Sequence, residues 1–141
     1  MPELSNLFDL GGRVAVVTGG VGLLGVEFCK TLAKAGAAVV IADVDGKSAT
    51  EIAESLNRDS FRALGLETDV TRLDSVHRMV SAVLEKFGRL DILVNSAAVD
   101  PKFDLEHIGV REEGAEKKRS LTNASIPFEK YPLELWNQAL A

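Results

Sequence analysis

The 141-residue chain has one cysteine, one tyrosine, two histidines and no long apolar run. The single cysteine, Cys29, excludes an internal disulfide, and we expect it to be a buried, unreactive thiol. No apolar stretch reaches the ~18 residues that a membrane span needs, so no membrane partner is expected. Pro2 and Glu3 follow the first methionine, unlike the charged leader and apolar core of a secretory signal, which favours a cytoplasmic location.

Acidic residues outnumber basic ones, 21 to 16, and there are only two histidines. The net charge is −5, and no basic patch with interleaved aromatic residues occurs, which argues against nucleic acid as a partner. His107 has no second histidine close to it, so no metal site is expected. The hydrophobic fraction of 46% and the charged fraction of 26% are ordinary for a globular protein, and the length allows one domain with a real core.

A glycine-rich turn between an apolar run and helix-like sequence is the most informative stretch. The run Val14 to Val17 leads into Thr18-Gly19-Gly20-Val21-Gly22-Leu23-Leu24-Gly25. Backbone N–H groups at a helix start attract an anionic pyrophosphate, and glycines let it approach the backbone. A turn that only packs a strand against a helix uses similar glycines, so both interpretations stay open here. If the turn binds a dinucleotide, the residues expected to contact it are Thr18, Gly19, Gly22, Leu23, Leu24 and Gly25.

A second apolar run, Val39 to Ala42, ends in Asp43, about 20 residues beyond the turn. A carboxylate there accepts hydrogen bonds from both ribose hydroxyls of an adenosine, and its charge repels a 2′-phosphate. The turn has no Lys or Arg to bind such a phosphate. The alternative is a helix-cap or turn role, because Asp43-Val44-Asp45-Gly46 is also good turn sequence. Turn and acid together predict NAD as the cofactor, in preference to NADP.

Further motifs follow in order along the chain. Residues 9–19 open the first strand, Asp69-Val70 follow the third expected strand, and residues 91–98 read Asp-Ile-Leu-Val-Asn-Ser-Ala-Ala. Their order and spacing resemble the amino-terminal portion of a short-chain dehydrogenase/reductase, well over residues 7–98 and loosely over residues 132–141. The resemblance implies that Asp69 and Val70 contact the adenine, and that Asn95 and Ala97 belong to the cofactor site.

Two departures from the family pattern bear on activity. The glycines fit T-G-x-x-G-x-x-G, the spacing of the family's longer, sugar-nucleotide-handling branch, whereas the shorter branch would have glycine at Leu23. In the family's Tyr-x-x-x-Lys pair, the lysine lowers the pKa of a tyrosine that exchanges a proton beside the nicotinamide. Here the residue four places after Tyr131 is Leu135. We therefore assign no catalytic residue and expect this chain to bind cofactor without turning over.

The apolar pattern alternates between strand and helix. Strands are expected at 13–18, 37–42, 61–67 and 90–95, and helices at 22–35, 46–57 and 73–87. Right-handed crossovers then give an α/β fold, a Rossmann-type doubly wound parallel sheet of strand order 3-2-1-4 without the carboxyl-terminal strands of a full domain. Gly36 and Gly88 are expected to end helices, and Thr71 or Asp74 to cap the third. The apolar face expected for the first helix is Leu24, Phe28 and Leu32.

The expected organisation is an NAD-binding half-domain over residues 1–98, a long loop or substrate lid over 99–131, and the start of a helix over 132–141, where the chain is truncated. The strand at 90–95 would be an exposed apolar edge, which predicts pairing with another copy in a homo-oligomer, pairing with another protein, or aggregation. Three functions stay open. They are part of an NAD-dependent oxidoreductase acting on a small-molecule alcohol or ketone, a fragment of a sugar-nucleotide epimerase or dehydratase, and a non-catalytic nucleotide-binding module.

Overall fold

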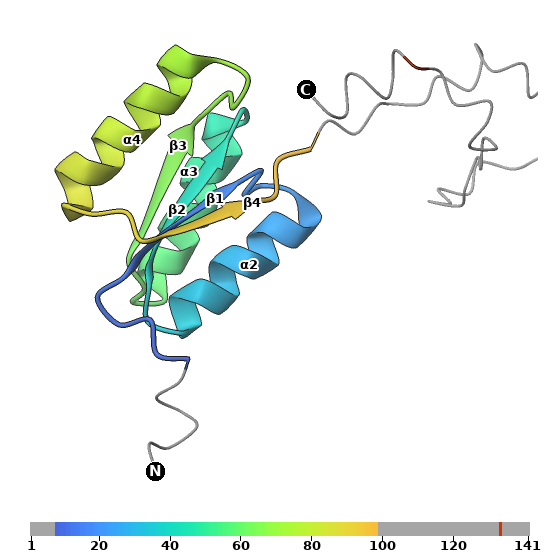
Figure 1. Cartoon of the computed structure of the whole chain (residues 1–141). Helices are drawn as coiled ribbons and strands as arrows, with labels where there is room; N and C mark the ends of the chain where they lie inside the picture. The colour runs from blue at the N-terminus through green and yellow to red at the C-terminus, as the bar shows by residue number, and fades with distance from the viewer. Residues whose placement is uncertain (1–7, 99–132, 134–141) are drawn as a thin grey trace, which may run out of the picture. The chain divides into compact units, whose positions relative to one another are not determined.

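The computed structural model describes residues 8–98 and Leu133. Over residues 8–98, parallel strands alternate with helices (Figure 1). The strands are β1 (Val14–Thr18), β2 (Ala38–Asp43), β3 (Ala63–Glu67) and β4 (Ile92–Asn95). The helices are α2 (Leu23–Lys34), α3 (Gly46–Arg58) and α4 (Leu73–Phe87). Every one of the seven predicted elements occurs, with bounds within two residues of those expected.

The sheet has the strand order β3-β2-β1-β4 and is parallel throughout, as predicted. β1 pairs on one side with β2, Val14 opposite Ala38, and on the other with β4, Ala15 opposite Ile92. The connection through α4 carries the chain from β3 at one edge to β4 at the other, so the direction of winding reverses between β1 and β4. In open α/β sheets a ligand crevice lies beyond the carboxyl ends of strands at such a reversal.

Helices cover both faces of the sheet (Figure 1). On one face α2 and α3 pack against Ala15, Val17, Val39 and Ile41, and on the other α4 packs against Val14, Val16 and Val40. All of β1 and nearly all of β2 are buried, which is why both strands are continuous apolar runs rather than alternating ones. β3 and β4 are the edge strands of the described sheet, and both have mixed burial.

The predicted apolar face of α2 is wrong at two of its three positions, while Leu32 packs partly buried against the core as expected. Leu24 is 66% exposed and Phe28 is 40% exposed, while the residues that α2 buries are Gly25, Cys29 and Ala33. Small residues face the sheet because the helix backbone lies very close to the end of β1, where a Cβ on Gly25 would collide with the carbonyl group of Gly19. Cys29 is fully buried as expected, and burial raises the pKa of its thiol to about 12.

The expected cap of α4 is also wrong, whereas the glycine end of that helix is confirmed. The N-cap position is Arg72, without a side-chain hydrogen bond to the helix. Thr71 instead donates its N–H and its hydroxyl to Oδ1 of Asp69, at 2.9 and 2.7 Å, so it is drawn away from the helix start. Gly88 ends α4 in the left-handed conformation, with φ +77°.

Asp91 joins the amino ends of β1 and β4. Its Oδ2 accepts the N–H of Val14 at 2.9 Å, Arg89 donates to both of its oxygens, and Arg13 donates to Oδ1 at 3.3 Å. The side chain is 13% exposed. The Arg89 guanidinium, followed by the Val14 N–H, lowers the pKa of Asp91 to about 2, so the carboxylate stays ionised. This contact sets the register in which β1 and β4 reach the opposite, carboxyl edge of the sheet.

Candidate functional site

Thr18 joins the carboxyl ends of β1 and β4. Its buried side-chain oxygen accepts the N–H groups of Ser96 at 3.2 Å and Ala97 at 3.3 Å, and its hydroxyl lies 3.4 Å from the carbonyl oxygen of Val94. Asn95, the last residue of β4, is the parallel partner of Thr18. Of the residues predicted for the site, Thr18, Asn95 and Ala97 are thus brought together.

The glycine turn is packed so tightly that Gly19 and Gly25 have no room for a side chain. Gly19 has φ +65°, and a Cβ there would lie 2.7 Å from Cα of Ala97. Gly25 is pressed against the backbone of Gly19. Gly22 is different, because its φ is −63° and a Cβ would meet only the Gly19 carbonyl oxygen, at 3.2 Å. Gly19 and Gly25 therefore let the turn lie against both α2 and the residues after β4.

The start of α2 is open to an anion. Its N-cap is Gly22, no side chain caps the helix, and the first turn contains no acidic residue. The first N–H groups of a helix have no partner within it, and the helix dipole makes this end positive. Leu23 is 89% exposed and Leu24, as noted, is also largely exposed, so neither side chain is packed over these groups. A diphosphate fits this position by charge, and no side chain occupies the cap.

Asp43 ends β2 beside this turn. Its Oδ2 accepts the N–H of Val21 at 3.1 Å, and its Oδ1 accepts the N–H of Asp45 at 3.1 Å. The two bonds orient the carboxylate and leave lone pairs on both oxygens for further donors. Of the alternative roles, the helix cap is wrong, because the N-cap of α3 is Asp45. The turn role is present, because the bond from the N–H of Asp45, two residues on, closes an Asx turn. Sequence reasoning did not identify Val21 and Asp45 as partners of Asp43, since the Val21 contact crosses between two strands.

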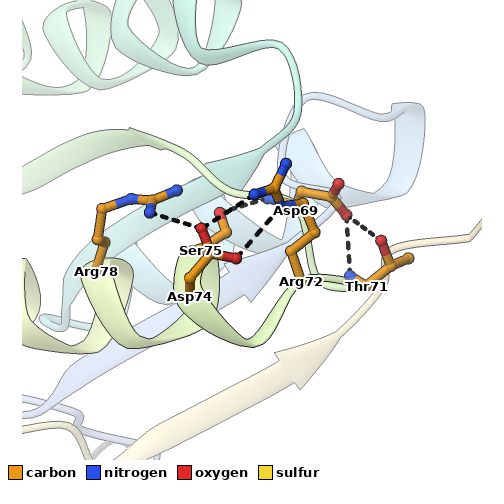
Figure 2. Close-up of polar contacts among 6 residues, drawn as sticks. All are labelled: Asp69, Thr71, Arg72, Asp74, Ser75 and Arg78. Carbon is orange, nitrogen blue, oxygen red and sulfur yellow. Dashed lines mark hydrogen bonds and ion pairs between the residues drawn. The ribbon is translucent and has the colours of Figure 1, made fainter.

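Asp69 and Val70 lie farther along the sheet edge, after β3. The Thr71 hydroxyl, followed by the Thr71 N–H, lowers the pKa of Asp69. Figure 2 shows this contact and a second one, in which the N–H of Asp69 donates to Oγ of Ser75 at 3.0 Å. Asp69 shares with Val44, the residue after Asp43, the lining of a polar hollow. Asp69 is therefore near the end of β2 but is not joined to Thr18 or the glycine turn by a hydrogen bond.

Two arginines enclose an acid on the wall of the same hollow. Asp74 accepts from Arg72 at 3.3 Å and from Arg78 at 2.8 Å (Figure 2). The Asp74–Arg78 pair has the i,i+4 spacing of a helix-surface ion pair and was readable from the sequence, although it was not singled out. Arg72 and Arg78 share one carboxylate, but the lining of the hollow also includes Glu67 and Asp69, so its three acidic side chains outnumber its two basic ones.

The described residues contain neither a metal-binding cluster nor a membrane-spanning helix. In the part of the chain from Phe8 to Ala98, no three His, Cys, Asp or Glu side chains are grouped as a metal ion would need. Across the same described part, none of the helices has the length and apolar character needed to cross a membrane. Tyr131 and the predicted segments 99–131 and 132–141 lie outside the described residues, apart from Leu133.

Known proteins share this arrangement. The family model described as short chain dehydrogenase matches residues 13–117. A short chain dehydrogenase/reductase astE from Aspergillus oryzae is 45% identical over 95 residues, which are 67% of this chain and 36% of that protein. Galactitol 2-dehydrogenase from Agrobacterium fabrum is 39% identical over 109 residues, 77% of this chain and 40% of its own length.

One solved structure supports the fold independently. An oxidoreductase from Haemophilus influenza, crystallised with bound NAD, matches with a TM-score of 0.65 and 24% identity, over 71% of this chain and 36% of its own. This chain thus spans well under half the length of the relatives that it matches. The matched family model covers most of the chain, including the glycine turn, Asp43, Asp69 and the residues after β4. The chain therefore belongs to the short chain dehydrogenase family.

Proposed function

We propose that this chain is the cofactor-binding portion of an NAD-dependent oxidoreductase that moves hydride between a small hydroxyl or carbonyl substrate and NAD. One observation carries the proposal. The carboxylate of Asp43 is hydrogen-bonded to Val21 of the turn that opens into an uncapped helix start. A charged acceptor and a set of free N–H donors are thus held next to each other, as an adenosine diphosphate moiety requires.

Each residue of the proposed site has a distinct task. The N–H groups at Leu23 and Leu24 bind the pyrophosphate, and Asp43 accepts the ribose hydroxyls. Gly22 leaves room for the diphosphate, while Gly19 and Gly25 let the turn pack against α2 and the residues after β4. When bound, NAD supplies or accepts the hydride. The chain's own residues bind and orient it.

The remaining site residues border the two ends of the cofactor. Asp69 and Val70 contact the adenine. Thr18 holds Asn95 and Ala97 beside the turn, on the side that leads toward the substrate. The Thr18 contacts to Ser96 and Ala97 support this task, because they tie the residues after β4 to the turn.

NAD is preferred over NADP in this proposal. The acceptor oxygens of Asp43 suit hydroxyl donors and repel a 2′-phosphate. The glycine turn from Thr18 to Gly25 contains no Lys or Arg that would compensate for this repulsion.

The activity belongs to the whole protein in this proposal. The relatives are two to three times longer than the matched region, and one is named as a dehydrogenase of galactitol, a polyol. A secondary alcohol or its ketone is the substrate class that we propose. Without a Tyr-x-x-x-Lys pair, the 141 residues by themselves bind cofactor and do not turn over. Residues 1–98 then form the cofactor half-domain and residues 99–131 the substrate lid of a cytoplasmic homo-oligomer.

The glycine spacing favours a second candidate, the sugar-nucleotide-handling branch. Gly22 caps α2 and Leu23 stands where the shorter branch has glycine. In that case NAD would be a transient hydride carrier during epimerisation or dehydration. Incubating the parent protein with NAD and either secondary alcohols or a nucleoside-diphosphate sugar separates the two. Net NADH formation supports the first, and sugar conversion without net NADH supports the second.

Calorimetric titration of the 141-residue chain with NAD and NADP tests the proposal. We expect weak binding of NAD and at least tenfold weaker binding of NADP. Asp43→Ala removes two hydrogen bonds to a charged acceptor, which at about 1.5 kcal/mol each corresponds to about a 100-fold loss of NAD affinity, and it shrinks the difference between the cofactors. Asp59→Ala, at the far end of α3, is the matched control and should change neither. Equal affinity of the unaltered chain for both cofactors would contradict the assignment of Asp43.

A further inference from the structure

Asp45 contacts both Asp43 and the helix that follows it. Its N–H donates to Oδ1 of Asp43 at 3.1 Å. Its Oδ1 accepts the N–H of Ser48 at 3.0 Å, and its Oδ2 accepts the Ser48 hydroxyl at 2.7 Å. The side chain of Asp45 therefore caps α3, while its backbone orients the carboxylate of Asp43.

The position of Asp45 is set by close packing of α3 on β3. A Cβ on Gly46 would lie 2.6 Å from Cβ of Glu67 at the end of β3. A Cβ on Gly65 of β3 would likewise collide with the backbone of Ala49 and Thr50, which lie one turn farther along α3. These contacts hold the start of α3 against the sheet edge. The N–H of Asp45 is consequently held in place toward Asp43.

Asp45 adds a second negative charge at this edge. The Ser48 N–H and then the Ser48 hydroxyl lower the pKa of Asp45, so its carboxylate is ionised at neutral pH. The neighbouring cation, Lys47, is 3.9 Å from Glu51 and points along the helix surface. The positive end of α3 is thus occupied by the protein's own anion.

We infer that Asp45 is a second determinant of the preference for NAD over NADP, acting through the cap of α3 and its contact with Asp43. The inference rests on the proposed function. A hydroxyl on the ribose bound by Asp43 is uncharged and tolerates a neighbouring carboxylate. A phosphate at the same oxygen would meet two carboxylates instead of one and would find the start of α3 already capped. Asp45 is in this view both a positioning residue for Asp43 and a barrier to the 2′-phosphate.

The two roles are separable by substitution. Asp45→Asn keeps an N-cap acceptor and removes the charge, because Asn caps helices about as well as Asp. Asp45→Ala removes both the cap and the charge. Asp59→Asn makes the same charge change at the other end of α3, about 20 Å away along the helix, and is the matched control.

The experiment is calorimetric titration of the 141-residue variants with NAD and with NADP. For Asp45→Asn we expect the NAD Kd within about twofold of the unaltered chain and the NADP Kd tighter by a factor of about five, because one of the two negative charges that oppose the phosphate is removed. For Asp45→Ala we expect a similar gain for NADP, together with about threefold weaker NAD binding, because the N–H at residue 45 is no longer held. Asp59→Asn should change neither Kd.

The outcomes distinguish a failure of the role of Asp45 from a failure of the proposed function. If Asp43→Ala lowers the preference for NAD but Asp45→Asn gives the same NAD-to-NADP ratio as Asp59→Asn, the proposed function stands and the role of Asp45 is refuted. If the unaltered chain binds neither nucleotide, the proposed function fails and the inference fails with it. Circular dichroism melts confirm that each variant is folded, and an Asp45→Ala chain that does not fold leaves Asp45→Asn to decide.

Discussion

Gly19→Ala is the substitution whose cost the structure defines best. Gly19 has φ +65°, and a Cβ there would lie 2.7 Å from Cα and 2.8 Å from N of Ala97. Gly12 has a similar φ of +74°, but a Cβ there would meet nothing within 4 Å. The same substitution at Gly12 therefore measures the backbone strain alone, and the difference between the two measures the collision with the residues after β4.

The magnitudes follow from these two terms. A non-glycine residue in the left-handed region costs about 1 kcal/mol, which is the whole effect expected for Gly12→Ala. Overpacking costs about 1–3 kcal/mol, and the upper end applies at Gly19 because backbone atoms cannot turn away as a side chain does. We therefore expect Gly19→Ala to lower the free energy of unfolding by about 3–4 kcal/mol.

Urea unfolding followed by circular dichroism is the assay. With an m-value of about 1.5 kcal/mol/M for a chain of this size, the two variants should differ in midpoint by about 1–2 M urea. Gly19→Ala should also weaken NAD binding, because relieving the collision moves Ala97 away from Thr18. Equal midpoints for the two variants would refute the close approach of Gly19 to Ala97.

Three further predictions concern other parts of the fold. The pKa of Asp91 is lowered to about 2 from an ordinary 3.8, so its contribution to stability is present above pH 4 and lost as the pH falls toward 2. Asp91→Asn should therefore lower the melting temperature at pH 7 and converge with the unaltered chain near pH 2; parallel curves would exclude this linkage. Cys29 should resist a thiol reagent in the native state and react after addition of guanidinium, and fast native labelling would show that it is not buried. Leu93 is 53% exposed on β4, which among the described strands pairs only with β1, so Leu93→Lys should shift a self-associating chain toward monomer in light scattering; a monomeric unaltered chain would contradict this.

The elements that sequence alone predicted well are those whose burial is uniform. β1 and β2 are buried along nearly their whole length, so their apolar runs are unambiguous. The places of the glycine turn after β1 and of Asp43 at the end of β2 were also predicted, whereas their binding of a cofactor stays a prediction. Strand order then followed from the handedness of the crossovers.

The predictions failed where contacts between residues far apart in the sequence decide which side chains are buried or bonded. Hydrophobicity pointed to Leu24 and Phe28 as the buried face of α2, but the distance between helix and sheet is set by Gly25, which leaves room only for small residues. Likewise the bond from Val21 to Asp43 joins residues 22 positions apart and appears only when both strands are in place. The cap of α3 was within reach of sequence reasoning, because Asp45 and Ser48 have the spacing of an N-cap and its partner.

The most direct test of the central claim is a titration of the ¹⁵N-labelled chain with NAD, followed by amide chemical shifts. If the pyrophosphate binds at the start of α2 and the ribose at Asp43, the largest shifts fall on Val21, Leu23, Leu24 and Asp45. The amides of α4 around Arg78 should move little. Shifts confined to α4, or none at Leu23 and Leu24 at saturating NAD, would contradict the account.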